Sequence, residues 1–241
     1  MDASFGSHVT CFVSARLTAA SPRRFIARLG WLQGNALPLL VLLLLGAAGS
    51  SLRAQTANFA GTISTIAIDS STLHPEGGAF DAAGNLYLAD ATSGVNNVWK
   101  FPANGDGTYG TPTAILASPT PLLHPLNVAV DPSGNVWVAD NGTAANGQVY
   151  EIVNTGGTLA TTATPVGTGW NAPAGIIADA SGNIWVTDNG ANTLSEITGG
   201  GPPTVINSGL SGPWGLTIDP SSGTMYIAEG SWLDSLPSPY T

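Results

Sequence analysis

The sequence predicts an all-β protein assembled from repeated hairpins, and two observations support this prediction. The chain of 241 residues contains 31 glycines and 17 prolines but only 9% charged residues, a composition that suits short strands joined by tight turns. The phrase NVWVADNG at 135–142 recurs as NIWVTDNG at 183–190, with looser copies at 85–92 and 224–231. A phrase that recurs at intervals of this length indicates a repeated structural unit.

Each repeat begins with a short apolar strand, turns at a D-x-x-G sequence and continues into a second strand of alternating pattern, which predicts a β-hairpin. The four aligned repeats are residues 74–90, 124–140, 172–188 and 212–229. In each turn Asp accepts hydrogen bonds from the backbone two residues on, and Gly supplies a positive φ. The turn glycines are Gly84, Gly134, Gly182 and Gly223.

Further strands follow each hairpin. Third strands are expected at 96–103, 147–153 and 192–198, and fourth strands at 111–118 and 163–169. Four antiparallel strands in a unit of this length are typical of one blade of a β-propeller, in which each blade packs its faces on its neighbours. The second strands carry an aromatic residue at one shared position, which we expect to fill the gap between blades. These aromatic residues are Tyr87, Trp137, Trp185 and Tyr226.

The string P-x-G-x-x-x-D-x-x-G-N-x-W-V-A-D resembles the NHL repeat, and the resemblance extends over about residues 60–232. It implies a relationship to the six-bladed propellers that include gluconolactonase-like enzymes, streptogramin B lyase and peptidyl-hydroxyglycine lyase. Members of this group range from enzymes to scaffolds that only bind. The resemblance therefore implies a fold and leaves the chemistry open.

The repeats amount to about three and a half blades, and a closed propeller has 4 to 8. The complete blades are expected at about 77–118, 127–168 and 175–208, with the first half of a fourth at 215–232. Residues 231–241 stand where its third strand is due, and residues 62–69 precede the first blade, where the outer strand of a last blade is often placed. We expect a partial propeller that belongs to a longer protein, and pairing with a second copy is the alternative.

The first 54 residues resemble an export segment that precedes the propeller at 55–241. A basic stretch precedes the apolar run 36–48, which is shorter than the roughly 20 residues of a bilayer span and suits a helical signal peptide. We expect a secreted or periplasmic protein cleaved after Ser50 or Ala54, and an uncleaved membrane anchor is the alternative. The pair Arg23–Arg24 leaves the general and twin-arginine export routes both open.

The charge distribution narrows the range of partners. Five of the six basic residues lie before residue 55, so the rest of the chain carries Lys100 against fourteen carboxylates. A surface of that sign repels nucleic acid and anionic lipid, so neither is expected as a partner. Protein, peptide and carbohydrate ligands, and cations, remain open.

Two histidines occupy equivalent positions in adjacent repeats. His74 and His124 each precede a proline at the start of a first strand, which would place both near one mouth of the propeller channel. With Glu76 they form a candidate site for a divalent cation, since imidazole and carboxylate suit zinc or iron. The resemblance to gluconolactonase-like enzymes implies a cation held by oxygen ligands, and Glu76 and Asn127 are the residues here that lie in the matching loops. Ordinary loop histidines are the alternative, because the third and fourth repeats carry Ala172 and Gly212 instead.

Two other sets of residues have both a structural and a functional interpretation. The second strands end in carboxylates, which we expect to accept hydrogen bonds from the following turn rather than to form a cation ring. These are Asp90, Asp140, Asp188 and Glu229. Trp170 and Trp214 lie in or beside the loops at the channel mouth, where their rings would suit sugars or peptides, unless the next blade buries them.

The function that follows is a secreted binding or scaffold module. The sequence lacks a G-x-S-x-G elbow, a Walker sequence and a dinucleotide fingerprint. The alternative function is a metal-dependent lactonase or lyase whose remaining site residues lie in further blades.

Overall fold

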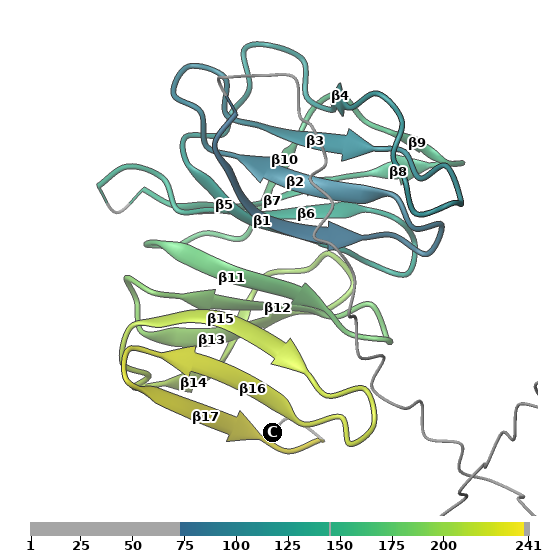
Figure 1. Ribbon diagram of the computed structural model, residues 1–241. Helices are drawn as coiled ribbons and strands as arrows, with labels where there is room; N and C mark the ends of the chain where they lie inside the picture. Colours follow the sequence, from purple (N-terminus) through teal and green to yellow (C-terminus); the bar gives the residue numbers. More distant parts are fainter. Residues whose placement is uncertain (1–72, 145, 239–241) are drawn as a thin grey trace, which may run out of the picture. The chain divides into compact units, whose positions relative to one another are not determined.

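The computed structural model describes residues 73–144 and 146–238, and its described part is all-β. The export segment and residues 62–69 lie outside these residues. The strands form three four-stranded antiparallel sheets and one three-stranded sheet, which follow one another along the chain as blades (Figure 1). Within the described residues no helix is long and apolar enough to cross a membrane.

The strands of each blade follow the order predicted from the repeats. The first blade contains β1 (Pro75–Phe80), β2 (Leu86–Asp90), β3 (Asn97–Phe101) and β4 (Thr113–Ala114). The second contains β5 (Pro125–Val130), β6 (Val136–Asp140), β7 (Gln148–Ile152) and β10 (Thr164–Val166), and a small hairpin of β8 (Asn154–Thr155) and β9 (Thr158–Leu159) extends from it. The third contains β11 (Pro173–Ala178), β12 (Ile184–Asp188), β13 (Thr193–Ile197) and β14 (Thr204–Ser208).

The fourth blade extends further than the sequence predicted. It contains β15 (Pro213–Ile218), β16 (Met225–Glu229) and a third strand, β17 (Trp232–Leu236), in the segment where no strand was assigned. β17 pairs along its whole length with β16, from Glu229 opposite Trp232 to Met225 opposite Leu236. The half blade of the sequence prediction is therefore a three-stranded sheet.

Consecutive blades contact each other mainly through their first strands, so that β1, β5, β11 and β15 lie side by side in chain order. This is the arrangement of a β-propeller, in which the first strand of each blade lies nearest the axis. Each first strand also carries a register shift just after its proline, where it pairs with the end of the second strand.

The described residues form three hydrophobic core clusters, one between each pair of consecutive blades. Tyr87 packs with residues of the second blade, Trp137 with the third and Trp185 with the fourth. All three rings are buried, whereas Tyr226 is half-buried. The prediction that the shared aromatic position fills the gap between blades is confirmed at these three rings.

Candidate functional site

The two ends of the blades carry different chemistry. At one end, here called the loop end, each first strand begins and each second strand finishes, because Pro75 pairs with Asp90, Pro125 with Asp140, Pro173 with Asp188 and Pro213 with Glu229. At the opposite end, here called the turn end, lie the four D-x-x-G turns. The sequence-predicted site residues belong to the loop end.

The carboxylates at the ends of the second strands are buried and accept hydrogen bonds from backbone N–H groups. Asp140 accepts hydrogen bonds from the backbone N–H of Leu123 at 2.7 Å, His124 at 2.6 Å and Gly142 at 3.1 Å. Asp188 accepts the equivalent bonds from Asn171, Ala172 and Ala191, Asp90 from His74 and Thr92, and Glu229 from Ser211. The predicted structural role is confirmed for the turns after Asp90, Asp140 and Asp188. The same carboxylates also accept hydrogen bonds from backbone N–H groups in the loop before each first strand, and these bonds were not predicted.

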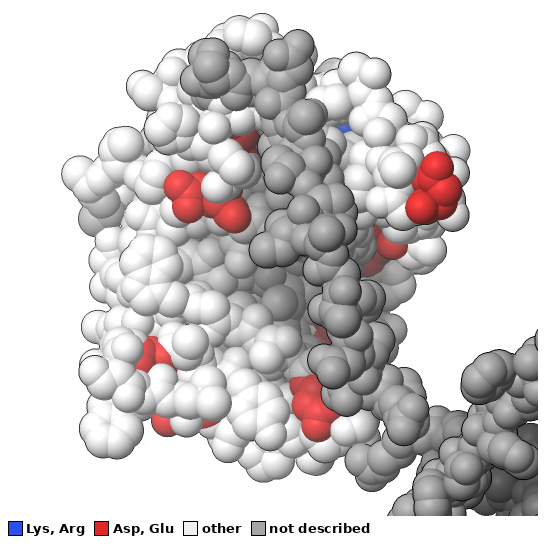
Figure 2. Space-filling model, in the orientation of Figure 1, with Lys and Arg blue, Asp and Glu red and all other residues white. Residues whose placement is uncertain are grey.

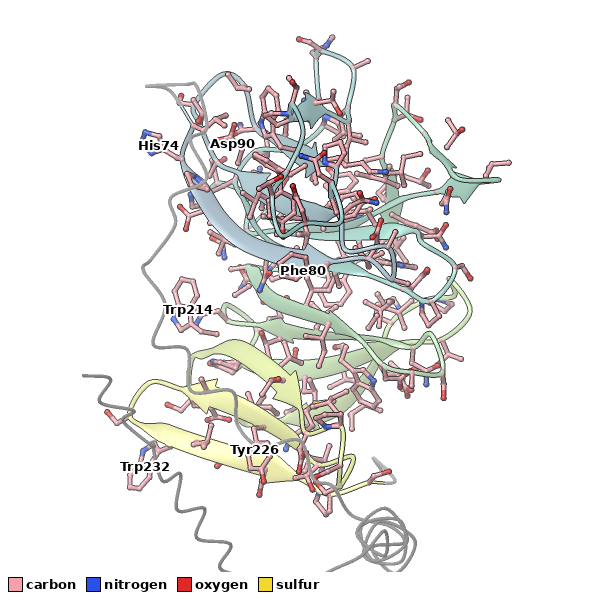
Figure 3. The ribbon with its side chains drawn as sticks, turned by 45° about the vertical axis from the view of Figure 1, so that its right-hand side comes forward. His74, Phe80, Asp90, Trp214, Tyr226 and Trp232 are labelled. Carbon is pink, nitrogen blue, oxygen red and sulfur yellow. The ribbon has the colours of Figure 1, made fainter. Side chains whose placement is uncertain are left out.

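The histidines occupy the equivalent positions that the sequence indicated. His74 and Glu76 are exposed, and His124 is half-buried. Figure 3 shows His74 beside Asp90 at the loop end, with its ring directed outward from the ribbon. Among residues 73–144 and 146–238, no three His, Cys, Asp or Glu side chains are grouped so that they could hold a metal ion. A cation site at this end would therefore need ligands in addition to these three residues.

Asn127 lies at the seam between the first and second blades. Its side-chain oxygen accepts a hydrogen bond from the backbone N–H of Val128 at 2.9 Å. The same oxygen lies so close to Gly77 that a Cβ on that glycine would meet it at 2.3 Å. The amide thus packs against the neighbouring first strand, and this contact accounts for its position without a ligand.

The two candidate tryptophans differ in exposure. Trp170 is only 8% exposed, packs in the core between the second and third blades and donates its indole N–H to the carbonyl of Val166 at 2.8 Å. Trp214, in β15, is 55% exposed and points outward at the loop end (Figure 3). Its backbone is fixed, because its carbonyl accepts the hydroxyl of Thr187 at 2.6 Å. Of the two, only Trp214 presents a ring to a ligand.

The sequence analysis did not identify Trp232, which is 75% exposed and begins β17 opposite Glu229 at the loop end. It belongs to a third strand, and therefore lies farther from the propeller axis than Trp214 in the first strand. The missed strand β17 explains the omission, because the residues around Trp232 were not expected to be ordered in a sheet.

The turn end contains two hollows that the sequence analysis also missed. One of about 480 Å³ is lined by the first three turns, including Asp81, Asp131 and Asp179. Another of about 660 Å³ lies between the third and fourth blades, where Asp179, Glu196 and Asp219 contribute carboxylates. The recurring D-x-x-G sequence could have indicated these hollows, because it places several aspartates at one end of the sheets.

Most of these turn carboxylates hold their own turns together. Burial alone would raise the pKa of Asp179, but hydrogen bonds from Trp185, Asn183 and Ser181 outweigh burial and lower it. Hydrogen bonds from Ser222 and Ser221 lower the pKa of Asp219 to about 2. Figure 2 shows acidic side chains distributed over the visible face rather than gathered in one patch. The aspartates of the turn end are therefore committed to the fold.

Comparison with known proteins supports the fold. No family model and no curated protein matches the sequence. Among solved structures, a streptogramin B lyase shares 18% identity with a TM-score of 0.55, covering 72% of this chain and 58% of the lyase. A gluconolactonase from Xanthomonas campestris shares 16% identity with a TM-score of 0.56, covering 68% of this chain and 56% of that protein. A calcium-binding regucalcin from Agrobacterium tumefaciens shares 15% identity with a TM-score of 0.52, covering 65% of this chain and 53% of that one.

The chain thus spans little more than half the length of these proteins. At identities this low the likeness establishes the architecture, a β-propeller of the kind found in gluconolactonases and streptogramin B lyases, and leaves function open.

Proposed function

We propose that this protein is an NHL-type propeller that acts as a binding module and takes a neutral sugar or a basic peptide at its loop end. The observation that carries the proposal is the contrast at that end between Trp214 and the recurring carboxylates. Trp214 is more than half exposed on a fixed strand, whereas the carboxylates are buried and bonded to backbone N–H groups. A rigid, exposed indole ring is suited to stacking on a sugar face or a cationic side chain.

The charge of the chain supports the same ligand classes. Lys100 is the only Lys or Arg after residue 55, where fourteen carboxylates lie. A field of that sign favours cationic ligands, tolerates neutral ones and opposes anionic ones. The ligand classes that remain are those an indole ring recognises well.

The test is calorimetric titration of the full chain with a panel of neutral oligosaccharides and with oligo-lysine. Trp214→Ala is expected to weaken binding by about tenfold, the equivalent of one stacked ring. Trp232→Ala is the matched control, because this ring is more exposed but lies on the third strand of the same blade. Binding that survives Trp214→Ala and is lost in Trp232→Ala would move the site to the outer part of the blade and refute the proposal.

The second candidate function is a metal-dependent lactonase or lyase. The equivalent positions of His74 and His124 at the loop end favour it, as does the architecture shared with a gluconolactonase and a streptogramin B lyase. The test is lactone hydrolysis by the full chain with added Ca²⁺, Mn²⁺ or Zn²⁺. Turnover lost in both His74→Ala and His124→Ala would establish the enzyme and replace the binding module.

We also propose export of the protein, with the propeller outside the cytoplasm. The basic stretch and apolar run that precede residue 55 support it. Fractionation of cells that produce the full chain tests this proposal. A full-length chain retained in the cytoplasm would refute it, and an uncleaved chain in the membrane fraction would favour the anchor.

A further inference from the structure

Among residues 73–144 and 146–238, no blade packs on one face of the fourth blade, whereas the same face of each of the other three blades is covered by the next blade. In each blade the side of the sheet that bears the shared aromatic residue packs against the following blade, and we call it the following face. One cross-strand pair marks this face in every blade. The pairs are Ala89–Val98, Ala139–Val149, Thr187–Leu194 and Ala228–Leu233.

The first three pairs are completely buried, with 0% exposure of all six residues. In the fourth pair Ala228 is exposed and Leu233 is 67% exposed. Because the register makes the four pairs equivalent, the difference reflects the missing neighbour rather than a different local structure. A large apolar side chain exposed at a position that is otherwise core is typical of an interaction surface.

The glycines of the first strands give the same result independently. A Cβ on Gly77 would collide with Asn127 and the Leu126 carbonyl of the second blade, and a Cβ on Gly175 would meet the Trp214 carbonyl at 2.3 Å. At the equivalent Gly215 no atom of the described residues lies within 4 Å of an added Cβ. The space that the next first strand fills beside the first and third blades is, in the described part of the chain, open beside the fourth.

The first blade has the complementary face, which in later blades packs against the preceding blade and is called here the preceding face. Phe80 is 61% exposed, although its counterparts Val130, Ala178 and Ile218 pack into the core clusters between blades. Leu88 is half-buried, although its counterparts Val138, Val186 and Ile227 are buried. Trp99, paired with Leu88, is also half-buried on this face.

We propose that a second copy of this chain covers the fourth blade, with its first blade docked as a following blade. The two exposed faces are the two halves of an interface that the chain already forms three times. The marker residues Leu233, Ala228, Phe80 and Leu88 carry no charge, so the acidic chain can join through them without repulsion between these side chains. Such head-to-tail contacts close into a ring when the rotation permits. The described residues of two copies would together supply eight blades, within the range of known propellers.

This proposal goes beyond ligand binding and does not depend on it. The test is light scattering during size-exclusion chromatography of the full chain over a wide range of concentrations. We expect the mass of two chains, or of a longer head-to-tail series. Leu233→Asp should weaken the association by on the order of a hundredfold, because it would place an unpaired carboxylate in an apolar seam. Gly215→Val should also weaken it while the monomer stays folded, as measured by circular dichroism.

The control is Val205→Asp in β14, which alters a 57% exposed side chain on an outer strand and should leave the mass unchanged. Phe80→Asp should act like Leu233→Asp, and a mixture of the two variants should associate because each retains the face that the other lacks. A chain that stays monomeric at all concentrations would overturn the proposal. An assembly insensitive to both substitutions, or a mixture that fails to associate, would overturn it as well.

Discussion

Trp185 donates its indole N–H to the carboxylate of Asp179 across 3.1 Å, and so links the ring that fills a seam between blades to the turn of its own hairpin. The same bond joins Trp137 to Asp131 at 3.0 Å and the Tyr87 hydroxyl to Asp81 at 3.1 Å. The D-x-x-G turn and the aromatic position of the repeat are therefore one structural unit. Each of the first three repeats fixes its turn with the same side chain that packs on the next blade.

The bond between Trp185 and Asp179 predicts a specific loss of stability. Trp185→Phe retains an aromatic ring but removes the N–H and some buried volume, and should lower the free energy of unfolding by about 2 kcal/mol. Tyr226→Phe is the matched control, because Tyr226 is half-buried and the Asp219 carboxylate is held by the hydroxyls of Ser221 and Ser222. Urea denaturation of both variants measures the difference. An equal loss in the two would mean that the indole N–H contributes nothing.

The buried Asp140 predicts a larger effect at the loop end. Asp140→Ala leaves the backbone N–H groups of Leu123, His124 and Gly142 without their acceptor, and should cost roughly 3 kcal/mol of stability. Asp106→Ala is the control, since this carboxylate bonds Thr108 in an exposed loop and its loss should barely change the unfolding midpoint. If Asp140→Ala is as stable as the unaltered chain, the carboxylate has another role, and cation binding at this end should be reconsidered.

The sequence predicted the blades because their strands and turns are encoded locally. The D-x-x-G turn, the alternating second strand and the following third strand each lie within a short window, and the structure places them as expected in the first three blades. β17 was missed because residues 231–241 contain two prolines and no alternating pattern. Its pairing with the neighbouring strand β16, from which a tight turn separates it, makes Trp232–Leu236 a strand.

The site was less predictable because it depends on contacts between distant residues. Asp140 bonds the backbone of His124, 16 residues earlier, and no local pattern shows this. Trp170 and Trp214 both lie in or near the loop before a first strand. The seam between the second and third blades buries Trp170, whereas Trp214 remains exposed. Which ring faces solvent is decided by the packing of blades, a property of the whole fold.

The close contact at Gly175 predicts that even a methyl group is not tolerated there. In Gly175→Ala the added Cβ would lie 2.3 Å from the Trp214 carbonyl and 2.8 Å from the Thr187 hydroxyl, so the third and fourth blades must separate. Overpacking of this kind costs about 1–3 kcal/mol, and the unfolding midpoint should fall accordingly. Gly110→Ala is the control, because its nearest contact, at 3.6 Å, is an ordinary van der Waals distance. Equal stability of the two variants would show that the seam at Gly175 is looser than the structure indicates.

The acidic turns predict how stability depends on pH. The pKa of Asp219 is lowered from 3.8 to about 2, chiefly by the hydroxyl of Ser222, and the pKa values of Asp81 and Asp179 are also lowered. A carboxylate whose pKa is lower in the folded state stabilises the fold above its unfolded pKa, and this contribution is lost as pH falls toward the folded value. Stability should therefore drop between about pH 4 and pH 2.

Glu151 acts in the opposite direction. Burial and the nearby charge of Asp131 raise its pKa above 4.5, so its protonation favours the folded chain as pH falls toward that value. Urea denaturation at a series of pH values should show a small rise from neutral pH, followed by the acid loss. Glu151→Gln should abolish the rise, and Asp219→Asn should lessen the loss at low pH. A profile that is flat from neutral pH down to pH 3 would contradict the role of the turn carboxylates, because their ionised forms would then be no better stabilised in the folded chain than in the unfolded one.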